Sequence, residues 1–153
     1  MTKIIADAGS LCARKNEPAT ADIWLEINGT EFPARNWNDF AVVIMGWWSD
    51  ALLRILRKIS DRELIDFMDG PYAVEVTCVP GGRLMLRALQ GVDRKLEVEA
   101  GEVFTLSFVH EFVFQAHRLL DACKHKNWWS KDAEMLAASL QPLNLELLRI
   151  RNR

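Results

Sequence analysis

The strongest constraint on the fold is a pair of short segments that alternate apolar and polar residues on either side of a turn. Residues 74–78 carry apolar side chains at every second position, and residues 84–88 repeat this period of two. Pro80-Gly81-Gly82 lies between them and supplies the residue types that tight turns require. The pattern predicts a β-hairpin, so at least part of the core must be built on an antiparallel sheet.

The register of this hairpin follows from its side chains. A three-residue loop places Val76 opposite Leu86 and Glu75 opposite Arg87. Apolar side chains then meet on one face, and opposite charges meet on the other. A two-residue loop would instead place Val76 opposite Arg87, so we predict the first register.

A second hairpin is predicted nearer the N-terminus. Residues 23–27 alternate in the same way, and Asn28-Gly29 suits a two-residue turn in which both positions need positive φ. This turn places Leu25 opposite Phe32. Pro33 cannot donate to a sheet ladder, so it limits the returning strand to a short or edge strand.

Helical periodicity dominates two other regions. Apolar residues recur at three- and four-residue intervals over residues 38–58, and again over residues 108–123. Ser130 can cap a further helix, because its hydroxyl can accept from the free N–H groups of the first turn. Pro142 is expected to end or kink that helix, since proline lacks the N–H that a helix interior uses.

The order of these elements predicts the fold class. Additional strands are predicted at residues 11–15 and 96–100, so the chain reads as strands, helix, strands and then helices. We predict one α+β domain over residues 1–153, with a mostly antiparallel sheet of about five or six strands. Two to four helices are expected to pack on one face of that sheet.

Composition excludes several classes of partner. The net charge is −2, whereas a nucleic-acid-binding domain needs a strongly basic face. The cysteines Cys12, Cys78 and Cys123 are odd in number and far apart, which favours free thiols in a reducing compartment. The apolar run from Phe40 to Trp48 is shorter than the ~20 residues of a membrane span, and the N-terminal run is too short for a signal peptide. We expect a cytoplasmic protein that contacts neither membrane nor nucleic acid directly.

Catalytic and metal-binding motifs are missing from the sequence. It contains no nucleophile elbow, phosphate-binding loop, dinucleotide fingerprint or zinc-protease motif. His110 and His117 lie seven residues apart, whereas a helical metal site needs closer spacing or further ligands. We therefore predict no metal site, no cofactor and no enzymatic activity, although a site assembled from scattered residues stays open.

Glu63, Asp66 and Asp69 form an acidic group just before Gly70-Pro71. One interpretation is a cluster of carboxylates that binds a cationic partner or serves acid–base chemistry. The other is a solvated strand end, in which the segment from Asp69 onwards simply makes a turn. We take these three carboxylates as candidate partner-binding residues.

Six tryptophans are many for a chain of this length. Trp47 and Trp48 are neighbours on the predicted helix and point about 100° apart, so we expect Trp47 in the core and Trp48 at its edge. Trp24 lies on the polar side of its strand. Exposed tryptophans are frequent anchors at protein interfaces, which makes Trp24 and Trp48 candidate partner-binding residues. Large aromatics that fill a core are the alternative.

Four stretches stand out together: Phe32-Pro33, Trp37-Asn38-Asp39-Phe40, Trp47-Trp48 and Phe67-Met68-Asp69-Gly70-Pro71-Tyr72. Their order and spacing resemble a family of small, uncharacterised bacterial proteins loosely associated with polymorphic-toxin and contact-dependent inhibition loci. The resemblance covers about residues 24–130. In such loci small acidic proteins act as immunity factors, so the resemblance implies an immunity protein and carries no catalytic residues.

Two hypotheses follow. The first is a non-enzymatic binding protein, specifically an immunity protein that binds and neutralises a toxin domain through charge complementarity and buried rings. The alternative is a small-molecule-binding domain, or an enzyme with a scattered site, whose pocket lies near Trp48 or Asp69. The chain could be a monomer or a homodimer in either case.

Overall fold

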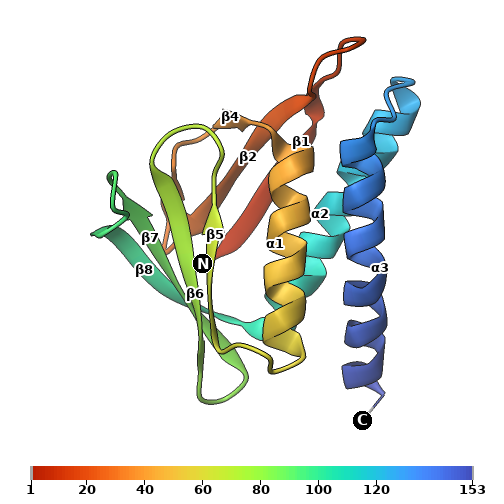
Figure 1. The fold of residues 1–153 in the computed structure, drawn as a ribbon. Coiled ribbons are helices and arrows are strands. Elements are labelled where there is room, and N and C mark those ends of the chain that lie inside the picture. The colour runs from red at the N-terminus through yellow and green to blue at the C-terminus, as the bar shows by residue number, and fades with distance from the viewer. Residues whose placement is uncertain (1, 153) are drawn as a thin grey trace.

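The fold is described over residues 2–152 by a computed structural model (Figure 1). The first antiparallel sheet contains β1 (Lys3–Cys12), β2 (Thr20–Ile27), β3 (Thr30–Phe32) and β4 (Asn38–Asp39). The second contains β5 (Arg62–Asp66), β6 (Tyr72–Val79), β7 (Arg83–Gln90) and β8 (Leu96–Phe104). The helices are α1 (Ala41–Leu56), α2 (Thr105–His125) and α3 (Lys131–Arg151).

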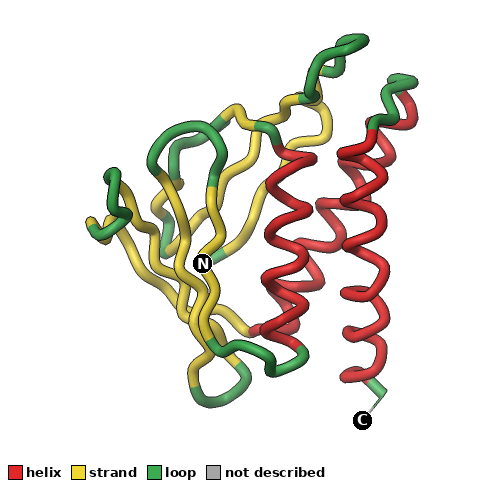
Figure 2. Tube along the Cα trace, in the orientation of Figure 1, coloured by secondary structure: helices red, strands yellow, loops and turns green. Residues whose placement is uncertain are grey.

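The predicted α+β class with antiparallel strands is confirmed, but the strands are divided between two sheets of four. The first sheet has the order β1-β2-β3, with β4 paired to β2, and the second runs β5-β6-β7-β8. Figures 1 and 2 show both sheets on one side of the molecule and the three helices on the other.

Both predicted hairpin registers are confirmed. In the second sheet Val76 pairs with Leu86, and Glu75 pairs with Arg87. In the first sheet Leu25 pairs with Phe32. Local alternation and turn chemistry therefore suffice to set strand pairing across these two turns.

The longest strand of the first sheet was predicted only at its end. The strand β1 begins at Lys3, and its pairing with β2 shifts between Asp7 and Cys12. Such an irregularity interrupts the period of two, so no continuous alternation marks the strand in the sequence. Ile4 and Leu11 are nevertheless both buried.

The helices pack against the inner faces of the two sheets. α1 packs against β5 and β2, α2 packs against β1, and α3 lies outermost against α1 and α2. α1 starts at Ala41, later than predicted, because Asn38 and Asp39 pair with β2. Ser130 caps α3 as predicted, accepting from the N–H groups of Asp132 and Ala133. Pro142 was expected to end or kink this helix; it does not end it, since α3 continues to Arg151.

One hydrophobic cluster links both sheets and all three helices. The sheets approach each other where β8 passes the β2–β3 turn. There the Asn28 side chain donates to the carbonyl of Ala100 at 2.7 Å. A Cβ on Gly101 would lie 3.0 Å from Ile27 Cγ2, so the glycine permits this close approach.

Candidate functional site

The predicted acidic patch is divided between the two faces of β5. Glu63 and Asp66 are three residues apart on one strand, so their side chains project to opposite faces. Glu63 lies on the helix side, where its Oε1 accepts from Arg54 Nη2 at 2.5 Å and Oε2 accepts from Ser60 Oγ at 2.5 Å. The hydrogen bonds from Arg54 and Ser60 lower the pKa of Glu63, although burial opposes them.

Asp66 and Asp69 are also separated from each other. Asp66 Oδ1 lies 2.8 Å from Arg94 Nε, and neither atom is accessible to solvent. Asp69 is exposed in the following loop, and its backbone N–H donates to Asp39 Oδ2 at 3.1 Å. Because two of the three carboxylates already have arginine partners, these residues do not present one free acidic surface to a cationic partner.

The tryptophan assignment for α1 is wrong in its orientation. Trp48 is 1% exposed, and its Nε1 donates to the carbonyl of Asp66 at 2.7 Å. Trp47 is the exposed neighbour, at 47%. Trp24 is also buried. Neither Trp24 nor Trp48 therefore offers its ring to a partner in this structure.

The stretches that carry the family resemblance meet in one place. Asp39, which is buried, accepts from three N–H groups: Trp37 Nε1 at 3.1 Å, the Asp69 backbone at 3.1 Å and the Phe40 backbone at 2.7 Å. One carboxylate thus joins the start of α1 to the loop between β5 and β6. The Trp37–Phe40 stretch and the loop after β5 are two halves of a structural joint.

Aromatic rings complete this joint. Four edge-to-face contacts link the two sheets and α1, with ring centroids 5.1 to 6.0 Å apart. Such contacts contribute beyond simple area burial. We call this set the aromatic joint; its members are Phe32, Trp37, Trp48, Phe67 and Tyr72.

The second sheet has an outer face that points away from the helices (Figure 1). Val76 and Leu86 are fully buried on the inner side, so their strand neighbours face outward. Leu64 and Phe104, 47% and 63% exposed, stand at the two edges of this face. We call it the outer face; its members include Arg62, Leu64, Glu75, Met85, Arg87, Glu97, Glu102 and Phe104.

Charges on the outer face are paired across all four strands. Arg62 Nη2 lies 2.5 Å from Glu75 Oε2, and Arg87 Nη1 lies 3.6 Å from Glu75 Oε1. Arg87 Nε lies 3.5 Å from Glu97 Oε1. This ladder of alternating sign leaves the centre of the face without a free charge, and Glu75 is almost buried within it.

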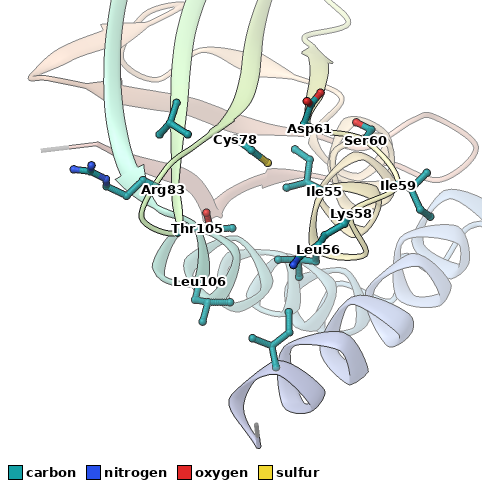
Figure 3. Close-up of a pocket in the computed structure, with 13 residues that line it drawn as sticks. Ile55, Leu56, Lys58, Ile59, Ser60, Asp61, Cys78, Arg83, Thr105 and Leu106 are labelled. Atoms are coloured by element: carbon teal, nitrogen blue, oxygen red, sulfur yellow. The ribbon is translucent and has the colours of Figure 1, made fainter.

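A cleft of about 780 Å³ opens at the end of the molecule where α1 finishes and α2 begins (Figure 3). Its lining comes from the end of α1 and the loop that follows it, the β6–β7 hairpin, the start of α2 and the end of α3. Trp48 and Asp69 do not line it, so it lies away from the place where a pocket was expected. No local sequence signal marks it, because its walls come from four separate parts of the chain.

The chain matches no protein-family model, no curated protein and no solved structure.

Cys123, Cys78 and His117 differ in their surroundings. Cys123 is buried, and burial raises the pKa of its thiol to about 11. Partial burial and the nearby Asp61 raise the pKa of Cys78. His117 Nε2 lies 3.1 Å from Asn144 Nδ2, which links α2 to α3.

Residues 2–152 contain neither a cluster of metal ligands nor a membrane-spanning helix. Over this range no three histidine, cysteine or acidic side chains gather in a way that could hold a metal ion. None of the three described helices combines the length and the apolarity needed to cross a bilayer.

Proposed function

We propose that this chain is a non-enzymatic binding protein that docks onto a partner protein through the outer face of its second sheet. The observation that carries the proposal is the exposure of Leu64 and Phe104 on a sheet face that no described helix covers. Exposed apolar side chains on a rigid element are the usual anchors of a protein interface.

The charge ladder supports the same use of this face. A charge that loses water on binding costs free energy unless it has a partner. Glu75 already lies between Arg62 and Arg87, so covering the centre of the face strips no isolated charge of its water. A partner then needs to supply mainly apolar contacts around Leu64, Met85 and Phe104.

The specific form that we propose is an immunity protein that blocks a toxin domain. The sequence resemblance motivates this choice, and the outer face replaces the acidic patch and the two tryptophans as the contact surface. Glu97 and Glu102, whose side chains are 51% and 41% exposed, lie at the β8 edge but are already paired with Arg87 and Arg83, so the apolar side chains of the face supply the main contact.

The experiment is coexpression with the protein encoded by the adjacent gene. We expect the two proteins to copurify and this chain to protect cells against its neighbour. Leu64→Glu and Phe104→Glu should abolish both effects, because each places an unpaired charge in the interface.

Leu145→Glu is the matched control, because Leu145 is equally exposed but lies on α3, away from the outer face. This variant should copurify like the original chain. Failure of the original pair to copurify would reject the partner, and unchanged binding by both outer-face variants would reject the surface.

A further inference from the structure

The cleft beside the end of α1 has the size and lining of a small-molecule site. Its volume of about 780 Å³ falls within the range of roughly 300–1,000 Å³ that is usual for ligand pockets. We propose that it binds an amphipathic carboxylate, a molecule with an aliphatic body of medium length and one terminal carboxylate.

The aliphatic part of such a ligand can pack against apolar side chains that line the cleft. Ile55 and Leu56 of α1 are buried at the base of the cleft, and Ile150 of α3 lines its side. Ile59 and Leu106 line the opening and remain 68% and 40% exposed. An aliphatic chain in the cleft would remove these apolar side chains from water, which is the main driving force for such binding.

One end of the cleft carries positive charge that can attract the carboxylate. Lys58 lines the cleft at the end of α1, and within residues 2–152 no ion pair engages it. α2 begins opposite with no side-chain cap and no acid in its first turn; the N–H of Thr105 donates to the carbonyl of Gly82 at 3.0 Å, but no negatively charged side chain meets the positive end of the helix dipole. Figure 3 shows Lys58 and Thr105 projecting into the same opening from facing sides.

The other charges of the cleft orient the ligand. Arg83 lies 3.2 Å from Glu102, so its charge is already partly neutralised. Asp61 lines the cleft beside Cys78 and repels a carboxylate from that end. The head group therefore belongs between Lys58 and the start of α2, with the aliphatic chain directed toward Ile55 and Ile150.

The test is calorimetric titration at pH 7 with octanoate and with 1-octanol, which has the same chain without the charge. We expect saturable binding of both, with octanoate about tenfold tighter because it gains an ion pair and a helix terminus. Lys58→Gln should weaken octanoate about fivefold and leave octanol unchanged. Lys95→Gln, at an exposed lysine of the β7–β8 loop, is the control and should change neither ligand.

The location can be tested in the unaltered chain through its own thiols. Cys78 lines the cleft, whereas Cys12 is exposed elsewhere, so the two respond differently to a ligand in the cleft. Octanoate should slow alkylation of Cys78 and leave that of Cys12 unchanged when each peptide is followed by mass spectrometry.

The proposal is overturned if octanoate shows no saturable binding, if octanol binds as tightly, or if Lys58→Gln has no effect on octanoate. Equal protection of both cysteines, or protection of neither, would place the ligand outside the cleft and would overturn it too. Partner binding through the outer face does not use Lys58 or Cys78, so the result of either experiment leaves the other proposal unaffected.

Discussion

The backbone N–H of Asp69 donates to the carboxylate of Asp39 at 3.1 Å, joining β4 to the loop after β5, 30 residues further along the chain. The same carboxylate holds the indole of Trp37, whose ring packs edge-to-face on Tyr72. These residues therefore fasten the start of α1 to the second sheet. We therefore expect substitutions that break these contacts to lower the stability of the fold.

Asp39→Asn should destabilise the fold strongly. The amide keeps one acceptor oxygen and replaces the other with a donor, so either the N–H of Phe40 or those of both Trp37 and Asp69 lose their acceptor in a buried place. We expect the free energy of unfolding to fall by about 2–3 kcal/mol, measured by urea denaturation. Asp50→Asn, at an exposed position of α1, should change it by less than about 0.5 kcal/mol. Equal effects at the two positions would contradict the fastening role.

The two neighbouring tryptophans of α1 should differ sharply. Trp48→Ala removes a buried ring and its hydrogen bond to Asp66, so we expect a loss of about 3–5 kcal/mol. Trp47→Ala, at the exposed neighbour, should cost about 1 kcal/mol or less. Both values come from chemical denaturation followed by circular dichroism. A larger loss at Trp47 would show that the helix faces the other way.

Gly70→Ala should be more costly than Gly82→Ala. Both glycines have positive φ, +82° and +68°, so alanine is strained at either position. Only at Gly70 does the added Cβ meet a ring, 2.7 Å from Tyr72 Cε2, whereas the space beside Gly82 is open. We expect Gly70→Ala to lower the free energy of unfolding by about 1–2 kcal/mol more than Gly82→Ala. Equal losses would mean that Tyr72 can move aside without cost.

Glu63 should make stability depend on acid pH. Its pKa is lowered in the folded chain, chiefly by the hydrogen bond from Arg54, so its contribution is present above the unfolded value of about 4.5. That contribution is lost as the pH falls below 4.5 through the folded pKa. Glu63→Gln should therefore lower the melting temperature at pH 7, and the difference from the unaltered chain should shrink toward pH 3.

Glu134→Gln, at an exposed residue in the first turn of α3, is the control for this titration. It should not reproduce the pH dependence of the Glu63 variant. A difference between Glu63→Gln and the unaltered chain that stays constant from pH 7 to pH 3 would show that the Arg54 contact does not stabilise the carboxylate.

The features that follow from the sequence are the local ones. Val76 pairs with Leu86, and Leu25 pairs with Phe32, as the alternation and the turn residues predict. The same holds for the Ser130 cap, which depends only on groups within the first turn of α3. These features need no information about distant parts of the chain.

The predictions that were wrong, and the features that were not predicted, depend on tertiary packing. Residues 41–48 are apolar throughout, so no polar face fixes which side of α1 turns inward, and Trp47 and Trp48 were exchanged. Glu63 found its partner on α1 and Asp66 found its partner beyond β7, neither of which strand alternation reveals. The cleft is assembled from four elements and leaves no local pattern at all.

We propose that the aromatic joint is scaffold and that the outer face makes the contact. The most direct measurement is the dissociation constant of the proposed partner, if the copurification experiment identifies one, for Trp48→Phe and for Leu64→Glu, by calorimetry with both variants shown to be folded. The account predicts that Trp48→Phe binds within about threefold of the unaltered chain, while Leu64→Glu binds at least about thirtyfold more weakly. Weakened binding by folded Trp48→Phe together with unchanged binding by Leu64→Glu would contradict it.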